Sequence, residues 1–260
     1  MSAPSHGHEV CVASLNIWNL NGPDFRREVA LPQFLRECDP NIVLLQEVSL
    51  IPNGRPQSVD LARFLNLPVE RYYFAGTWQG REEGLAILSK FPVVSEYRLS
   101  LPTGTDGMGR AICGLTLDSP FGSLDVFTTH LAFPIDAGAD RERQARACRS
   151  FIHQINPDFR QRPIIFGGDF NDQPGSATVG LFLGDGVFVD SMAGIPAEAR
   201  VTFALENPYT DPALHPGRCI DYVLHNSMLA TVEARVAGAA VDARLVPSDH
   251  YAVLARLCPK

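Results

Sequence analysis

The chain has 260 residues, 45% of them hydrophobic, and its 22 basic and 29 acidic residues give a formal net charge of -7 at pH 7. This hydrophobic content supports a substantial buried core and excludes a disordered chain. The acidic balance argues against a large basic groove for duplex nucleic acid, although a local basic patch or a metal ion can still hold a phosphate.

The N-terminal residues 1–8 are small and polar and lack the basic start and apolar stretch of a secretory signal. We expect these residues to be disordered and the protein to be cytoplasmic. No apolar run of about 18 residues, the length that a membrane-spanning helix needs, occurs in the chain.

The first elements are two strands around a helix. Apolar runs at residues 9–17 and 41–46 suit central strands, and a helix is predicted between them over residues 24–38. Pro32 lies inside that helix and lacks a backbone N–H, so we expect a break or kink there.

A second, short helix is predicted over residues 58–67, with Ser58 or Asp60 as its cap. Strand-like runs follow, separated by turn residues such as those of the Gly-rich segment 102–109. These runs are residues 71–75, 84–89, 93–99, 110–117 and 123–130.

A long helix fits residues 140–155 in the second half of the chain, and an apolar strand fits residues 163–168. The remaining elements are a short helix at 176–183, a short strand at 186–190, a loop at 191–217 and strands at 219–224, 231–236 and 250–257. Because hairpins outnumber strict strand–helix–strand alternation, we predict an α/β fold of two packed sheets with helices outside.

No internal repeat or linker divides the chain, so we predict a single domain over residues 1–260, and we expect a monomer. The six cysteines are scattered without a C-x-x-C pair. This spacing favours buried free thiols over a disulfide framework or a zinc site.

Polar residues stand at the ends of the predicted apolar strands, where packing in a core does not explain them. They are Asn16, Glu47, His130, Asp169, Asn171, Asp221, Asp249 and His250. Strand ends at one rim of a sheet sandwich are places where a rigid scaffold positions a functional site. Asp169 and Asn171 could instead form a simple Asx turn after their strand.

The chemistry of these residues suits phosphate-ester hydrolysis. Their carboxylate and amide oxygens favour Mg²⁺ or Mn²⁺ over zinc, which prefers nitrogen and sulfur. His130 and His250 can transfer protons near neutral pH, and Asp221 could orient one imidazole or merely bond the nearby Arg218. Arg110 could hold a phosphate oxygen, or form a surface salt bridge.

Six short motifs resemble those of the endonuclease/exonuclease/phosphatase superfamily, in the same order and over roughly residues 10–257. They are Asn16, Gln46-Glu47, Thr129-His130-Leu131, Gly168-Asp169-Phe170-Asn171, Ile220-Asp221-Tyr222 and Ser248-Asp249-His250. Residues 83–92 also resemble the middle strand of the family. The resemblance implies a DNase I-like fold, a four-layer sandwich of two mostly antiparallel β-sheets flanked by helices.

The resemblance also implies roles for individual residues. Metal ligation of Mg²⁺ or Mn²⁺ falls to Glu47, helped by Asn16 and Asp249. Arg110 and Asn171 are the implied phosphate-binding residues. The implied catalytic residues are His130, Asp169, Asn171, Asp221 and His250. Among these, Asp221 pairs with one of the two histidines, and both histidines flank the phosphate.

The implied activity is divalent-metal-dependent hydrolysis of phosphate esters, with a phosphodiesterase or endonuclease as the leading interpretation. A phosphomonoesterase, a sphingomyelinase-like lipid phosphodiesterase and a non-catalytic binding module are the alternatives, so nucleic acid, lipid headgroups and small phosphate esters are all candidate partners. Exposed apolar residues near the loop 191–217 would favour lipid, and a basic rim would favour nucleic acid. Trp18 and Trp78 could stack on a substrate, although core packing is the favoured interpretation.

Overall fold

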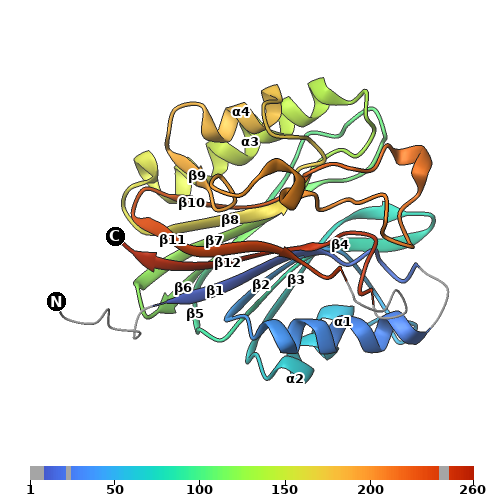
Figure 1. The fold of residues 1–260 in the computed structure, drawn as a ribbon. Helices are drawn as coiled ribbons and strands as arrows, with labels where there is room; N and C mark the ends of the chain where they lie inside the picture. Colours follow the sequence, from blue (N-terminus) through green and yellow to red (C-terminus); the bar gives the residue numbers. More distant parts are fainter. Residues whose placement is uncertain (1–8, 22–24, 240–245) are drawn as a thin grey trace.

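The computed structural model describes residues 9–21, 25–239 and 246–260, so the disorder expected of residues 1–8 lies outside the described residues. Two six-stranded sheets pack face to face between two layers of helices (Figure 1). Helices α1 (Phe25–Cys38) and α2 (Gln57–Leu65) cover one sheet, and α3 (Gly138–Ile155) and α4 (Ala177–Leu183) cover the other. The predicted four-layer α/β sandwich is confirmed.

The first sheet has the strand order β11-β12-β1-β2-β4-β3. Its strands are β1 (Val10–Asn16), β2 (Ile42–Ser49), β3 (Val69–Trp78), β4 (Arg81–Ser89), β11 (Leu229–Ala237) and β12 (Ala252–Pro259). Within the described residues, β1 and β2 form its one parallel pair and every other neighbouring pair is antiparallel.

The second sheet has the order β5-β6-β7-β8-β10-β9. Its strands are β5 (Val93–Ser100), β6 (Ala111–Ser119), β7 (Gly122–His130), β8 (Ile164–Asp169), β9 (Phe188–Asp190) and β10 (Asp221–Asn226). As far as the chain is described, β7 and β8 are its only parallel neighbours. Short 3-10 helices occur at η1 (Pro157–Phe159), η2 (Ala197–Arg200) and η3 (Pro212–Leu214), the last two within the long loop.

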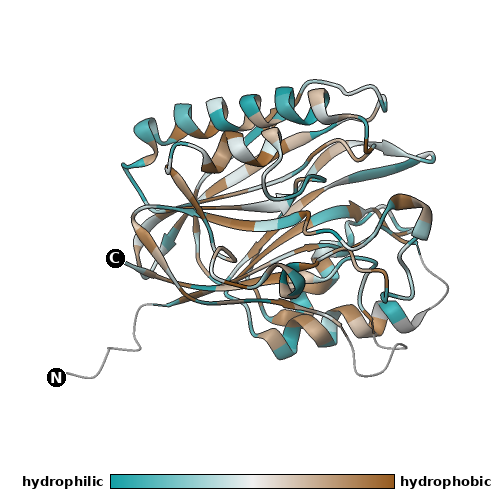
Figure 2. Cartoon of the chain, turned by 45° about the horizontal axis from the view of Figure 1, so that its top comes forward, coloured by the Kyte–Doolittle hydropathy of each residue, from teal (hydrophilic) through white to brown (hydrophobic). Residues whose placement is uncertain are grey.

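Alternate residues of the central strands enter different apolar layers. In β2, Ile42 and Leu44 pack between the two sheets, whereas Val43 and Leu45 face the helices. Both faces of such a strand are buried, which explains why it forms a continuous apolar run in the sequence. Hydrophobic residues accordingly run along the inner strands, while the helices combine hydrophobic and hydrophilic residues (Figure 2).

Two local expectations are wrong. Of the break or kink expected at Pro32, the break is absent, since helix α1 continues through this residue. Leu31 and Leu35 are buried against the first sheet, and that packing outweighs one lost hydrogen bond. Helix α2 begins at Gln57, so neither Ser58 nor Asp60 caps it. Those two side chains instead bond Glu70 and Arg55.

All six cysteines are free and four of them are buried, as their spacing predicts. Among the described residues, no helix is both long enough and apolar enough to cross a membrane.

The two parallel pairs place the candidate residues. Asn16 lies opposite Gln46 at the end of β1 and β2, and His130 lies opposite Asp169 at the end of β7 and β8. Asp221, the first residue of β10, is in register with Asp169 from the other side. Neighbouring parallel strands have their carboxyl ends at the same edge of a sheet. In each sheet, the polar residues at these ends therefore lie close together.

Close packing between the sheets gives a first prediction. A Cβ on Gly167 of β8 would lie 2.8 Å from both Leu44 Cδ1 and Tyr222 O. We expect Gly167→Ala to lower the free energy of unfolding by about 1–3 kcal/mol, measured by urea unfolding. Gly180→Ala is the matched control because nothing lies within 4 Å of its Cβ position in α4, and it should stabilise the helix by about 0.5–1 kcal/mol. Equal effects of the two substitutions would contradict this account of the packing.

Candidate active site

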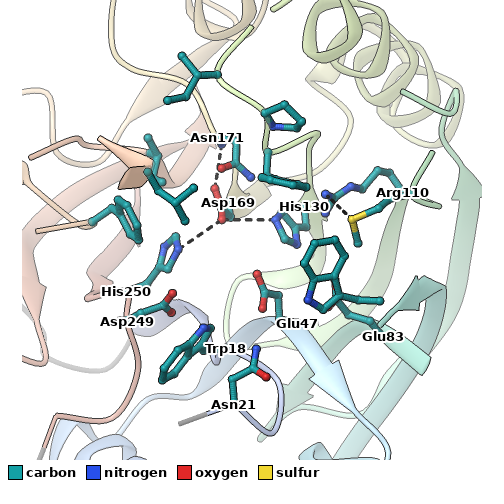
Figure 3. Close-up of a pocket in the computed structure, with 18 of the residues that line it drawn as sticks. Trp18, Asn21, Glu47, Glu83, Arg110, His130, Asp169, Asn171, Asp249 and His250 are labelled. Atoms are coloured by element: carbon teal, nitrogen blue, oxygen red, sulfur yellow. Dashed lines mark hydrogen bonds and ion pairs between the residues drawn. The ribbon is translucent and has the colours of Figure 1, made fainter. Parts of the chain in front are cut away.

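A pocket of about 360 Å³ opens where the strand ends meet, and seven of the nine predicted site residues line it (Figure 3). These seven are Glu47, Arg110, His130, Asp169, Asn171, Asp249 and His250. The other two, Asn16 and Asp221, lie behind this lining and hydrogen-bond to it. The structure therefore brings all nine predicted residues to one place.

Glu47 reaches the pocket through a distortion of β2. The pairing of β2 with β4 shifts between Leu45 and Val48, so Gln46 and Glu47 have no partner in the ladder with β4, although Gln46 still pairs with Asn16 of β1. Glu47 has a left-handed φ of 53°, which is uncommon for a residue with a Cβ. Bulges of this kind redirect a side chain, here taking the carboxylate out of the normal alternation of the strand.

Two asparagines hold the Glu47 carboxylate. Asn16 Nδ2 donates to Glu47 Oε1 at 2.9 Å and to Asp169 Oδ2 at 3.2 Å, and Asn19 Nδ2 donates to Glu47 Oε2 at 2.7 Å. Asn16 Oδ1, the atom expected to bind metal, accepts the backbone N–H of Trp18 at 2.9 Å. Metal ligation by Asn16 thus stays a prediction, while the hydrogen bonds show that it orients two carboxylates.

The pocket contains several acidic groups close to one another, of which Glu83 and Asp249 are buried and Glu47 is half-buried. Burial, together with the nearby Glu83 and Asp249 carboxylates, raises the pKa of Glu47 from its usual 4.5 to about 8. Burial likewise raises the pKa of both Glu83 and Asp249. Hard oxygen donors that repel one another in this way fit a divalent cation such as Mg²⁺ or Mn²⁺, which would stabilise their charged forms.

A second group of residues joins the two histidines. His250 Nδ1 lies 2.9 Å from Asp221 Oδ2, while Asp169 Oδ2 lies 3.8 Å from His250 Nε2 and 3.5 Å from His130 Nε2. Ligand atoms of Asp169, Asp221 and His250 all lie within 4.8 Å of one another, so this trio is also a possible metal site.

The histidines differ in charge because their surroundings differ. Burial disfavours the charged form of His250, but Asp221, Asp249 and Asp169 more than offset it and raise its pKa well above 6.5. Burial, Arg110 and His250 all lower the pKa of His130 well below 6.5. Burial and Asp221 raise the pKa of Asp169 to about 6. One histidine is therefore a cation at neutral pH and the other is neutral, with a carboxylate between them.

Asn171 and Arg110 complete the wall. The backbone N–H of Asn171 donates to Asp169 Oδ1 at 2.8 Å, so the expected Asx turn is present within the site. Arg110 is buried and bonds Asp106 Oδ2 at 3.3 Å, which makes it part of a buried ion pair and not of a surface one. Its Nε is buried and has no hydrogen-bond partner among the described residues.

The structure decides between the alternative interpretations of Asp221, Trp18 and Trp78. Asp221 pairs with His250 and not with Arg218, whose guanidinium lies over Phe203 and bonds backbone carbonyls. Trp18 and Trp78 are half-buried but line the pocket, so core packing alone does not describe them.

Sequence reasoning missed Asn19 and Glu83. Asn19 follows the first strand and is buried, with its Oδ1 accepting from Ser49 Oγ at 2.8 Å and its Nδ2 on Glu47. Glu83 is a buried carboxylate directly before Gly84 in an apolar strand. The signal for Glu83 was the same one that identified Glu47, an acidic residue next to a buried run.

The chain matches the sequence profile of the Endonuclease/Exonuclease/phosphatase family over residues 14–250. A search of curated protein sequences gave no significant match. The fold is shared with TDP2 from Caenorhabditis elegans, with TM-score 0.79 and 23% identity over 99% of this chain and 78% of that chain.

The fold is also shared with the human nocturnin catalytic domain with bound sulfate anion, at TM-score 0.78 and 16% identity over 97% and 95% of the two chains. A mannosyl-6-phosphatase from Bacteroides thetaiotaomicron aligns at TM-score 0.72 and 20% identity over 95% and 99%.

Asn19 gives a prediction about metal binding. Asn19→Ala removes the hydrogen bond to Glu47 Oε2 and should weaken Mn²⁺ binding about tenfold or more, as loss of a ligand-orienting partner does. The measurement is calorimetric titration with Mn²⁺, with thermal unfolding as the check on folding. Asn53→Ala, at an exposed position outside the pocket, is the matched control. A folded Asn19→Ala protein with unchanged affinity would contradict the role of Asn19.

The raised pKa of Glu47 gives a prediction about pH. The folded, metal-free protein keeps a proton on Glu47 up to a pKa of about 8, whereas the unfolded chain loses it near 4.5. The free energy of unfolding in chelator should therefore fall as pH rises across this window. Glu47→Gln should flatten that slope in urea unfolding measured at a series of pH values. A slope as steep in Glu47→Gln as in the unsubstituted protein would show that another group causes it.

Proposed function

Because the chain belongs to the endonuclease/exonuclease/phosphatase family, whose profile covers residues 14–250, we propose that it is a divalent-metal-dependent phosphodiester hydrolase. The observation that carries the proposal is the meeting of two groups in one pocket. Glu47, Glu83 and Asp249 form an acidic group, and Asp169 with the two histidines forms a proton-transfer group. Hydrolysis of a phosphate ester needs a bound cation that stabilises negative charge and groups that transfer protons, both next to the same phosphorus atom.

Glu47 and Asp249 would hold Mg²⁺ or Mn²⁺, with Asn16 orienting Glu47 and Glu83 adding negative charge. When bound, the ion would supply Lewis-acid stabilisation of charge on a phosphate oxygen. Arg110, whose buried Nε is without a hydrogen-bond partner in the described part of the chain, and Asn171 line the same pocket and would bind the other phosphate oxygens.

Asp169 is the general base in this proposal. With its pKa near 6 it is mostly ionised at neutral pH, yet basic enough to accept a proton from an attacking water. Asp221 holds His250 as an imidazolium, which stabilises negative charge developing on the phosphate. His130 is neutral and can donate a hydrogen bond to the phosphate or to the leaving oxygen.

Lipid-headgroup hydrolysis is a second candidate because of exposed leucines in the loop 191–217. Leu205 is 66% exposed and Leu214 is 42% exposed, and Leu214 also lines the pocket. Exposed apolar side chains at a pocket mouth suit contact with a lipid surface. Phosphomonoester hydrolysis is a third candidate, supported by the likeness to a solved mannosyl-6-phosphatase.

The test compares bis(p-nitrophenyl) phosphate, p-nitrophenyl phosphate, supercoiled plasmid and sphingomyelin vesicles, each with Mg²⁺, Mn²⁺ or EDTA. We expect cleavage of the diester with metal and none in EDTA. Failure to cleave any activated diester, by protein shown to bind Mn²⁺, would overturn the proposal.

One variant tests the charge-stabilising role of His250 separately. His250→Asn keeps an N–H donor for Asp221 and should lower kcat by about 100-fold or more, with Mn²⁺ affinity unchanged. His153→Ala is the matched control, because that side chain is exposed on α3 and lies outside the pocket. Turnover of His250→Asn near that of the control would remove His250 from the mechanism.

A further inference from the structure

The pocket also contains an aromatic corner that the proposed hydrolysis does not use. Trp78 at the end of β3 and Phe133 after β7 both line the pocket, with ring centroids 5.7 Å apart and ring planes at 78°. The two rings thus form adjacent walls at nearly a right angle. We call this feature the Trp78–Phe133 corner.

Register places this corner beside the acidic group. On β4, Glu83 lies opposite Gly76 of β3, and Trp78 is two residues beyond Gly76 on the same face. That face meets the other sheet, because a Cβ on Gly76 would lie 2.9 Å from the backbone of Gly109. Glu83 and Trp78 therefore project in the direction of Arg110, the residue after Gly109.

The other tryptophan in the pocket is already engaged. Trp18 stacks on Tyr209 with centroids 5.4 Å apart, and the guanidinium of Arg27 lies 5.5 Å from the centre of its ring. Figure 3 places Trp18 on the side of the pocket that holds Asp249 and Asn21. The Trp78–Phe133 corner is consequently the better placed surface for a substrate group.

We propose that the Trp78–Phe133 corner binds the nucleobase of a nucleotide substrate whose phosphate lies beside Glu47 and Arg110. The proposal rests on the proposed phosphoesterase function and specifies its substrate class. A planar base can stack on one ring while its edge meets the other. Gln79, which follows Trp78 and also lines the pocket, offers an amide that can hydrogen-bond a base edge.

A small nucleotide fits better than a long nucleic acid. Among the described lining residues, Arg110 and Arg218 are the only arginines and there is no lysine, and the chain has a net charge of -7. A polynucleotide would need several phosphate contacts along its backbone. A volume of about 360 Å³ lies within the range of small-molecule pockets.

A lipid chain fits this corner less well than a base does. It would gain nothing from the perpendicular arrangement of the two rings.

The chain contains two tryptophans, and both line the pocket, so intrinsic fluorescence reports on the site directly. The experiment titrates the protein, with Mg²⁺, against adenosine 5′-monophosphate, ribose 5-phosphate and dodecylphosphocholine. It is run on the unsubstituted protein and on Trp18→Phe, in which Trp78 is the one remaining tryptophan. Ribose 5-phosphate keeps the sugar and the phosphate but lacks the base.

We expect saturable quenching by adenosine 5′-monophosphate, with ribose 5-phosphate binding at least about tenfold more weakly, the loss expected for one stacked base. Phe133→Ala should remove that preference. Phe64→Ala, at an exposed aromatic residue of α2 outside the pocket, should retain it. Because the ligand comparison is also made on the unsubstituted protein, the test does not depend on the folding of any variant.

Equal affinity for the two phosphates would overturn the nucleobase subsite, as would quenching of Trp78 by dodecylphosphocholine alone. Hydrolysis of bis(p-nitrophenyl) phosphate by the same preparation separates the two proposals. If the diester is cleaved but the base gives no preference, the subsite is wrong and the phosphoesterase stands. If no diester is cleaved yet the base is preferred, the corner binds nucleotides and the hydrolase proposal fails.

Discussion

The register of two parallel strand pairs is the constraint on which the site depends. Asn16 lies opposite Gln46 in one sheet, and His130 lies opposite Asp169 in the other. Because parallel strands share a direction, neither pair can separate its polar ends without breaking a ladder buried on both faces. The hydrogen bond from Asn16 to Asp169 then joins the two sheets at this edge. A slip of one residue in either pair would turn its catalytic candidates into the apolar core.

Burial and neighbouring charges shift the pKa values of the ionisable groups differently on the two sides of the pocket. On one side, Glu47 lies near other carboxylates, and burial together with their charges raises its pKa to about 8. On the other side, Asp221 stabilises charge on His250 even though burial opposes it. Carboxylates in buried surroundings thus suit one side to an external cation, and on the other side they keep His250 protonated against the effect of burial. The charge difference between His250 and His130 has the same origin, since Arg110 faces His130 while carboxylates surround His250.

The sequence predicted site residues where a single local feature, a polar residue at the end of an apolar strand, marks the position. The polar residues at the ends of apolar strands led to the prediction of Glu47, His130 and Asp169 as site residues. The interior of a buried strand has few positions for a polar side chain. The residues it missed owe their roles to partners far along the chain. Asn19 lies in a turn whose sequence has no distinctive feature, and its role depends on its hydrogen bonds with Glu47 and Ser49. The expected cap of α2 and the expected break of α1 at Pro32 were wrong for a related reason, since tertiary packing overrode a local preference.

The division between sheet and loop also explains why motifs predict chemistry better than substrate. Four of the proposed site residues, Asn16, His130, Asp169 and Asp221, lie at strand ends whose positions are fixed by register. The groups that would meet the rest of a substrate come from loops or lie beside a turn. Trp78 is the last residue of β3, next to the turn to β4, Phe133 lies in the segment after β7, and Phe203 and Leu214 lie in the loop 191–217. Loops tolerate change that a double-sided buried strand does not. The same fold is therefore shared by proteins as different as nocturnin and a mannosyl-6-phosphatase, and substrate choice depends on the rim of the individual pocket.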